Sequence, residues 1–440
     1  MGKLISLTII IFFLNHCSFN QNSKIWTGDG QIKKKETKDN LELIFKKEND
    51  VSKDINLLSS KRLVFEKSKV KSQWNQRFQN RFNDTNNFTF LNQGEIKKFS
   101  KISKYKINKN ILFYKNNLFF SDIKGNIGVL SLTKNKIIYK FNFYKKKLKK
   151  QNKNIKLIIK DDIIVAADNF GYIYSLDYKK NKIKWAKNFL LPFRSNLKIL
   201  DNKLFLSDEK NKIIIINFET GDKIDEFYTQ PSKTVSKFEN NLSFDNLNRL
   251  IFLSTNGTLY SLTLNNQKMI NWINNFNIEN EIIFNAFPVL ISDNKLFIST
   301  NKSITMLNDN GAKNWSIRIK NKVAPIISGN FVITISDKNY LVIIEKKTGK
   351  ILFSKNLFKE LNKKYHGKNK KKVDQINKIH ISNNNLVLIA NNSYFIEFNL
   401  KDDISVETIK KNPFKINSDI IFVDQNMIFV GKNNKVYSIN

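Results

Sequence analysis

A repeated pattern runs through most of this 440-residue chain and limits the folds that it can adopt. It is clearest around residues 171–185, GYIYSLDYKKNKIKW, where two β-type runs flank a short polar turn. The pattern opens at an anchor residue, and apolar residues follow the anchor five and eight positions later. Eight anchors carry apolar residues at both positions: Asp122, Asp168, Asp208, Ser254, Ser299, Ser336, Ala390 and Gly431. Such regular recurrence indicates stacked copies of one supersecondary unit.

Each copy has room for four short strands. Successive anchors lie between 37 and 54 residues apart, and an aromatic residue such as Trp185 or Trp315 often follows the anchor after a turn. Another apolar run precedes most anchors. Short runs of Ile, Leu, Phe and Tyr between Asn, Asp and Lys turns are typical of β-strands. The sequence therefore predicts an all-β fold, an eight-bladed β-propeller with four-stranded blades, in which the repeated apolar positions form the core.

The last copy suggests how the ring closes. Its third strand ends at the last residue, Asn440, so a fourth strand must come from elsewhere in the chain. We expect a strand within residues 87–102, NFTFLNQGEIKKFSKI, to complete the last blade. This pairing would remove two open sheet edges.

The net charge of +37 raises the question of nucleic-acid binding. Only six of the 75 basic residues are arginine, so the forked side chains that read bases and phosphates are scarce. The lysines are spread over the whole chain. Lys, Asn and Ile all have AT-rich codons, and genome composition is a sufficient explanation. No nucleic-acid partner is predicted.

The N-terminus has the features of an export signal. Residues 1–17 combine a basic residue, Lys3, with an apolar run from Leu4 to Leu14 and the only cysteine, Cys17. The run is short for a membrane span but suits a signal-peptide core. The segment resembles a bacterial lipoprotein signal, which implies lipidation of Cys17, and Ser18 fits sorting to the outer membrane. An ordinary exported protein and an uncleaved anchor are the alternatives.

Two charged segments interrupt or precede the repeats. Residues 18–85 are highly charged and lack β alternation, which predicts a partly disordered tether before a propeller at 86–440. The basic stretch 359–372, KELNKKYHGKNKKK, is expected to be a surface loop.

The sequence contains few residues in patterns that are typical of catalytic sites. The three histidines, His16, His366 and His380, lack the spacing of metal ligands, and neither a nucleophile elbow nor a phosphate-binding loop occurs. The acidic anchors are best interpreted as turn formers. We therefore predict no catalytic residue, no metal site and no cofactor.

The repeat D-x-x-G-x-[IL]-Y-x-L resembles those of pyrroloquinoline-quinone (PQQ) dehydrogenases. Those enzymes bind calcium and a quinone in the channel and carry an adjacent cysteine pair, which this chain lacks. The signal, the tether, eight blades and the lead-in WNQRFQNRFNDTNNF at 74–88 together resemble BamB-type lipoproteins of the outer-membrane β-barrel assembly machinery. That resemblance implies a non-enzymatic scaffold, lipid-anchored at the periplasmic face of the outer membrane.

The resemblance also implies partners and a binding site. The partners are the periplasmic domains of the barrel-inserting subunit, BamA, and unfolded outer-membrane proteins. The loop 190–195, LLPFRS, matches the family's docking motif and supplies Leu191, Phe193 and Arg194. Glu239 and Asp245 stand where the family has a second, acidic element. Alternatively, the loop packs its own aliphatic residues onto the blade, and the chain is a quinoprotein oxidoreductase or another periplasmic interaction propeller.

Overall fold

The structure is a computed structural model. It describes residues 51, 53–57, 63–84, 87–91, 94–144, 148, 150–231, 239–264, 268–277, 284–364, 370–400 and 404–440. The chain divides into the units 1–49 and 50–440, and all described residues belong to the second. The expected signal peptide, Cys17 and the first part of the expected tether lie outside the described residues.

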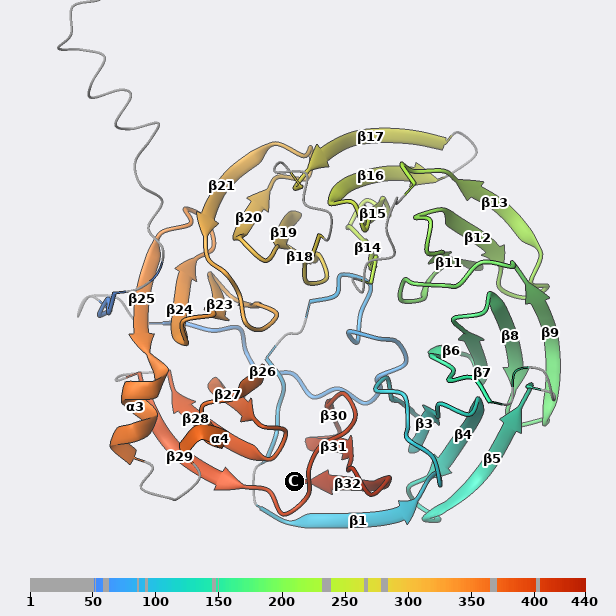
Figure 1. Ribbon diagram of the computed structural model, residues 1–440, viewed down its shortest axis with the longest axis horizontal. Coiled ribbons are helices and arrows are strands. Elements are labelled where there is room, and N and C mark those ends of the chain that lie inside the picture. The colour runs from blue at the N-terminus through green and yellow to red at the C-terminus, as the bar shows by residue number, and fades with distance from the viewer. Residues whose placement is uncertain are drawn as a thin grey trace, which may run out of the picture. The chain divides into compact units, whose positions relative to one another are not determined.

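The described strands form eight four-stranded antiparallel sheets around a common centre (Figure 1). We number these sheets as blades 1 to 8. In every blade the first strand named is the innermost. Blade 1 contains β2 (Leu112–Tyr114), β3 (Asn117–Ser121), β4 (Asn126–Ser131) and β5 (Lys136–Asn142). Blade 2 contains β6 (Lys156–Lys160), β7 (Ile163–Ala167), β8 (Tyr172–Asp177) and β9 (Lys182–Asn188). Blade 3 contains β10 (Lys198–Leu200), β11 (Lys203–Ser207), β12 (Ile213–Asn217) and β13 (Lys223–Phe227).

Blades 4 to 7 repeat this order. Blade 4 contains β14 (Leu242–Phe244), β15 (Leu250–Leu253), β16 (Thr258–Leu264) and β17 (Lys268–Asn275). Blade 5 contains β18 (Leu290–Ser292), β19 (Lys295–Ser299), β20 (Ser303–Leu307) and β21 (Lys313–Arg318). Blade 6 contains β22 (Ile326–Ser328), β23 (Phe331–Ile335), β24 (Tyr340–Glu345) and β25 (Ile351–Asn356). Blade 7 contains β26 (Ile376–Ser382), β27 (Asn385–Ala390), β28 (Tyr394–Asn399) and β29 (Ser405–Lys411).

Blade 8 is built from both ends of the propeller. It contains β30 (Ile421–Val423), β31 (Asn426–Val430) and β32 (Lys435–Ile439), and its outermost strand is β1 (Ile96–Lys101). β1 pairs antiparallel with β32, with Ile96 opposite Ile439. The predicted all-β fold with eight four-stranded blades is confirmed.

The repeated apolar positions lie in the third strand of each blade. Ile127, Ile173 and Leu259, five residues after their anchors, are completely buried. Most of the buried clusters contain residues of two or more neighbouring blades, such as blades 2 and 3 around Ile173. Each blade therefore buries its faces against its neighbours, which is why the repeat recurs so strictly.

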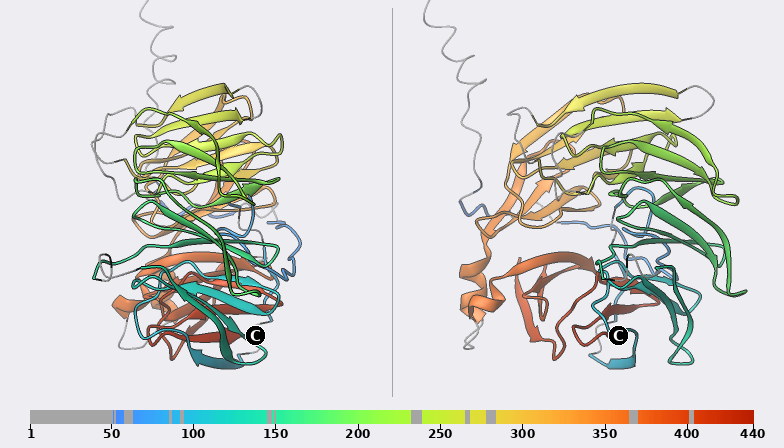
Figure 2. Two further views of the ribbon diagram at one scale, coloured as in Figure 1. Left: turned by 90° about the vertical axis from the view of Figure 1, so that its right-hand side faces the viewer. Right: turned by 45° about the vertical axis from the view of Figure 1, so that its right-hand side comes forward.

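A segment that precedes β1 lies in the centre of the ring (Figure 1), toward one of its faces (Figure 2). We call this segment, residues 63–84 and 87–91, the strap. Its residues Trp74 and Phe88 are buried. Trp74 and Phe113 of β2 exchange two backbone hydrogen bonds of 2.7 and 2.8 Å. The structure thus differs from the expected tether, because residues 63–84 pack against the blades.

The strap reaches every blade. Along the strap, backbone carbonyls accept hydrogen bonds in turn from blades 8, 1, 2, 4 and 5, and Phe88 bonds to blade 7. Blade 3 is reached through the Lys198 ammonium, which donates to the Asn80 carbonyl at 2.6 Å. Blade 6 is reached through the Glu66 amide, which donates to the Ser328 hydroxyl at 3.3 Å. The strap therefore satisfies the free inner edges of the sheets, which would otherwise expose backbone groups.

The basic stretch after blade 6 is partly helical rather than a simple loop. Helix α3 (Leu357–Lys364) buries Leu357 and Leu361, and α4 (Lys370–Val373) follows. Among the described residues, no helix combines the length and the apolar character that crossing a bilayer requires.

Candidate functional site

The loop that carries the expected docking motif connects β9 of blade 2 to β10 of blade 3. The turn after β7 holds one side: the Phe189 amide donates to the Gly171 carbonyl at 2.8 Å, and the Phe193 amide to the Asp168 carbonyl at 3.2 Å. The turn after β11 holds the other side, where the Arg194 amide donates to the Ser207 carbonyl at 2.9 Å. The loop is therefore fixed between the anchor turns of two blades.

The side chains of this loop differ in what they offer a partner. Leu190 is 81% exposed, in a left-handed conformation with φ 68°. Leu191 and Arg194 are half-buried. Phe193 is only 3% exposed, and its ring lies 5.8 Å from that of Phe189 in the core between blades 2 and 3. The structure therefore places Phe193 in the core, as the packing alternative expects. The exposed apolar side chain of the loop is Leu190 instead.

Gly171 explains how the loop passes so close to blade 2. It has φ 85°, and a Cβ there would lie 2.8 Å from the Leu191 carbonyl oxygen and 2.9 Å from the Leu190 and Leu191 amides. Only glycine tolerates both the backbone conformation and this approach. The glycine of the repeat thus shapes the loop that follows.

Glu239 lies in an ion cluster with the strap. Its carboxylate pairs with the Arg77 guanidinium of the strap, and the Lys156 ammonium of β6 lies 3.5 Å away. Lys156 also donates a hydrogen bond to the Arg194 carbonyl. The structure thus brings Arg194 and Glu239 together through one lysine, at the junction of the docking loop, blade 2 and the strap.

The charges of this cluster are strongly coupled. Burial alone would raise the pKa of Glu239, but Arg77 and Lys156 outweigh it and lower that pKa to about 2. Burial lowers the pKa of Lys156 to about 8, against the attraction of Glu239. Burial also holds the pKa of the nearby Lys198 well below its usual value. Glu239 is therefore ionised at neutral pH and neutralises cations that contact the strap.

Asp245 has a turn-forming role. Its carboxylate accepts hydrogen bonds from the Leu247 and Arg249 amides at 3.0 and 2.8 Å, and the Arg249 guanidinium lies 2.6 Å away. The residue is buried directly after β14. The structure does not place it beside the docking loop as an exposed carboxylate.

Sequence reasoning missed the parts of the site that the strap supplies. Arg77 and Trp74 belong to the lead-in 74–88 and Leu190 opens the loop 190–195, but no pattern in the sequence predicts their contacts. One signal was available: three of the six arginines, Arg62, Arg77 and Arg81, lie in a segment interpreted as a tether. Arg81 donates to the Asn248 side chain of blade 4 at 2.7 Å.

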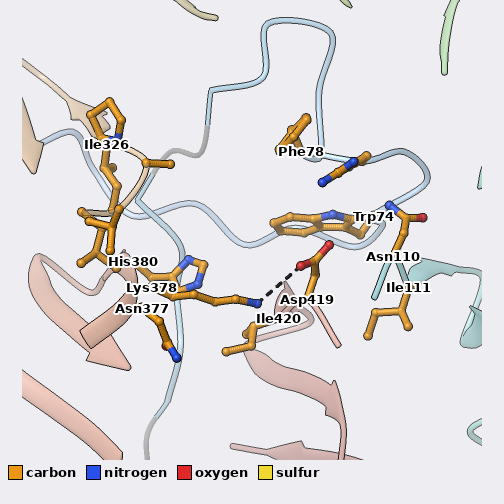
Figure 3. A pocket seen from close by; sticks show the side chains of 15 residues that line it. Trp74, Phe78, Asn110, Ile111, Ile326, Asn377, Lys378, His380, Asp419 and Ile420 are labelled. Carbon is orange, nitrogen blue, oxygen red and sulfur yellow. Dashed lines mark hydrogen bonds and ion pairs between the residues drawn. The ribbon is translucent and has the colours of Figure 1, made fainter. Parts of the chain in front are cut away.

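A cavity of about 240 Å³ lies beside the strap (Figure 3). Trp74, Arg77 and Phe78 of the strap line it, together with residues at the inner ends of blades 1, 6, 7 and 8. Within it the Lys378 ammonium lies 3.4 Å from the Asp419 carboxylate, and the two are joined by a dashed line in Figure 3. Burial lowers the pKa of His380 to about 3, so its imidazole is neutral.

This centre does not fit the quinone and calcium of PQQ dehydrogenases. The strap lies in the centre of the ring, where a propeller has its channel (Figure 1). Among the described residues, no group of three or more His, Cys, Asp or Glu side chains is placed to hold a metal ion. The cavity is also small compared with usual ligand pockets of roughly 300–1,000 Å³.

The fold and the repeat define an eight-bladed β-propeller of PQQ-like repeats. Residues 143–355 match the sequence model of the family described as outer membrane protein assembly factor BamB. The recognition of a BamB-type propeller of PQQ-like repeats is thereby confirmed. No curated protein sequence matches the chain at a significant level.

Solved structures show the same fold at low identity. BamB from Moraxella catarrhalis matches with TM-score 0.56 and 10% identity, over 77% of this chain and 98% of that one. A europium-containing methanol dehydrogenase matches with TM-score 0.57 and 11% identity, over 83% and 89%. The computationally designed protein Ika8 matches with TM-score 0.57 and 14% identity, over 78% and 98%. A BamB and an enzyme therefore share this architecture. The fold alone does not distinguish their functions, which must be distinguished by the residues of the site.

Proposed function

We propose that this protein is a non-enzymatic scaffold of the outer-membrane β-barrel assembly machinery, which docks on the periplasmic domains of a BamA-type subunit and aids the insertion of outer-membrane proteins. The observation that carries the proposal is the BamB family match, because residues 143–355 include the docking loop. The strap supports a scaffold role, since it lies in the centre of the ring, where a propeller has its channel.

The docking surface in this proposal is the loop 190–194 with its neighbours. Leu190 and Leu191 supply apolar contact beside Arg194, and such apolar residues next to arginine suit interface hot spots. The backbone is fixed by two blades, so little conformational entropy would be lost on binding. Phe193, Glu239 and Asp245 act indirectly in this scheme, by holding the loop, the strap and a neighbouring turn in place.

The proposal includes an anchor at the outer membrane. Residues 1–16 would be removed, and lipidation of Cys17 would hold the propeller at the periplasmic face. Mass spectrometry of the mature N-terminus tests this part. A chain that begins at Cys17 with attached acyl groups is expected, and an unmodified thiol would contradict it.

Affinity purification from detergent-solubilised membranes tests the docking. The wild-type protein is expected to recover the barrel-inserting subunit, and Leu191→Ala/Arg194→Ala to lose it. Leu247→Ala is the control, because this leucine is exposed on blade 4, away from the loop. Equal recovery of the subunit with all three proteins would refute the role of the loop in docking. No recovery with any of the three proteins would refute the scaffold function.

The similarity to a methanol dehydrogenase favours one other candidate, a PQQ-like quinoprotein oxidoreductase. The two can be separated by adding PQQ and Ca²⁺ to the purified protein. We expect no bound quinone absorbance after gel filtration. A stoichiometric, calcium-dependent absorbance would favour the oxidoreductase.

A further inference from the structure

The outermost strand of blade 4, β17, is an open sheet edge. Sheet order places it after β16, and among the described strands it pairs with β16 alone. The other side of β17 therefore presents backbone amide and carbonyl groups to any added strand. Natural proteins usually protect such edges with charged side chains or a covering segment.

β17 lacks this protection over most of its length. Its sequence from Met269 to Asn275, MINWINN, contains no charged residue. Each of the other seven outermost strands carries at least one charge beyond its first position: Lys140 in β5, Lys184 in β9, Asp225 in β13, Arg318 in β21, Lys355 in β25, Glu407 in β29 and Lys98 in β1. β17 is also the longest strand of the eight blades, with eight residues.

Apolar side chains stand exposed along this edge. Met269, Ile270 and Ile273 are 54%, 45% and 51% exposed. No other outermost strand has three exposed large apolar side chains among the described residues. Water contact with these side chains costs free energy that a covering partner would recover.

The neighbouring blade holds β17 in position. The Trp272 indole N–H donates to the Asp309 carbonyl at 2.9 Å, and the Asn274 side-chain amide donates to the Gly311 carbonyl at 2.9 Å. Gly311 leaves room for the Trp272 ring, since a Cβ there would lie 2.6 Å from it. The edge is therefore preorganised, and a partner strand would not have to order it.

We propose that β17 binds an extended polypeptide segment by strand addition, and that this segment alternates apolar with polar residues and is neutral or acidic. Main-chain hydrogen bonds would give affinity, while Met269, Ile270 and Ile273 would select the apolar positions. Charge selects against basic occupants, because the chain carries a net charge of +37. The same repulsion disfavours a second copy of this chain.

The inference goes beyond the proposed function because it requires no barrel-inserting subunit. Under that function, the natural occupant is a strand of an unfolded outer-membrane protein, since barrel strands alternate in this way. Loop 190–194 would then hold the machinery while β17 holds the client. The two surfaces lie on different blades and can be altered separately.

A binding assay with the full-length protein tests the inference. A fluorescein-labelled ten-residue peptide with alternating Val and Thr and two Asp residues is titrated, and its anisotropy is followed. Ile273→Lys places a charge on the edge and is expected to weaken binding by about tenfold or more. Ile183→Lys on β9, an equally exposed position of blade 2, is the matched control and should bind as the wild type does.

Hydrogen exchange gives a second measurement with the same peptide. Added protection is expected in residues 269–275 and nowhere else in the outermost strands. Equal affinity of Ile273→Lys, or protection on another blade, would overturn the proposal. Protection of β17 that depends on protein concentration without peptide would identify a second copy as the occupant and also overturn it. Leu191→Ala/Arg194→Ala should bind the peptide normally, so failure of docking and failure of strand addition are distinguishable.

Discussion

Asparagine and aspartate make most of the tight turns between strands. Non-glycine residues with positive φ include the pairs Asp161–Asp162, Asn383–Asn384 and Asp293–Asn294, each at the hairpin between the first two strands of a blade. These residues tolerate the left-handed region better than other side chains. A chain with only 14 glycines can therefore close many hairpins, as its composition predicts.

Substitution of Glu239 tests whether the ion cluster with Arg77 and Lys156 stabilises the fold. Glu239→Gln keeps the shape of the side chain but leaves Arg77 and Lys156 without their counter-charge. We expect the free energy of unfolding to fall by about 1–3 kcal/mol, measured by urea denaturation at pH 7. Glu219→Gln is the matched control, since Glu219 pairs with Lys184 at the surface. The free energy of unfolding of Glu219→Gln should fall by less than about 1 kcal/mol.

The pH dependence follows from the same carboxylate. The pKa of Glu239 is lowered to about 2 from an ordinary value of 4.5, so the unfolded chain binds its proton first as pH falls. The stability that Glu239 contributes is complete above pH 4.5 and is lost as pH falls toward 2. The difference in stability between wild type and Glu239→Gln should therefore shrink over this window. A constant difference would show that the ion cluster is not its source.

At the scale of single elements, the turn after β7 and the docking loop depend on each other. Gly171→Ala would introduce a Cβ into the backbone of Leu190 and Leu191, at a residue with φ 85°. We expect a loss of about 2–3 kcal/mol, from backbone strain and the clash together, and weaker recovery of the docking partner. Thermal denaturation and the affinity purification described above measure the two effects.

Gly94→Ala separates the clash from the strain. Gly94 has a similar φ of 83°, but a Cβ there would meet nothing within 4 Å. This variant should lose only about 1 kcal/mol from the left-handed conformation. It should also dock as the wild type does. Equal losses in both variants would show that the approach of the loop contributes nothing.

The blades could be predicted from the sequence, and the strap could not. Positions such as Ile173 and Leu176 recur because each blade must bury the same face, so packing leaves a period in the sequence. The strap makes backbone-to-backbone hydrogen bonds to six blades and reaches the other two through the Lys198 and Ser328 side chains, and the backbone bonds require no repeated side chain. Its charged composition also resembles a tether. Its place depends on a channel that exists only after the ring has formed.

In the candidate site, too, some features could be predicted from the sequence and others could not. An apolar-Pro-Phe-Arg loop after Trp185 can be read from the sequence, but Phe193 turns inward because the Gly171 turn draws the loop onto blade 2. Glu239 was expected from its position after blade 3, whereas its partner Arg77 lies 162 residues away in the chain. Pairings over such separations leave no signal in a single sequence.

On the scale of the whole molecule, the strap joins blades that do not touch one another. Adjacent blades share cores, so a damaged blade normally weakens its two neighbours. The strap instead carries six carbonyls that accept backbone N–H bonds from six blades: Lys71 from Asp424, Trp74 from Phe113, Asn75 from Ile159, Arg81 from Phe244, Phe82 from Ile291 and Phe88 from Asn383. Displacing the strap should therefore expose inner strands around the ring together.

Trp74→Ala tests whether the strap acts as one unit. Trp74 is buried against Phe88, with ring centroids 5.4 Å apart, so its removal should cost about 3–5 kcal/mol. Native-state hydrogen exchange should then show faster exchange of the Phe113, Ile159, Phe244 and Ile291 amides together, because these donors bond to strap carbonyls. The effect should reach blades 4 and 5, which do not contact Trp74.

Trp315→Ala is the matched control for this experiment. Trp315 is similarly buried, but it lies in the outermost strand β21, and its indole N–H donates to the Lys346 carbonyl of blade 6 at 2.9 Å. A comparable loss of stability is expected, with faster exchange confined to blades 5 and 6. If Trp74→Ala also changed exchange only in its nearest blade, the strap would be a set of separate contacts. Faster exchange on blades 1, 2, 4 and 5 at once would instead establish that one segment ties the ring together from inside.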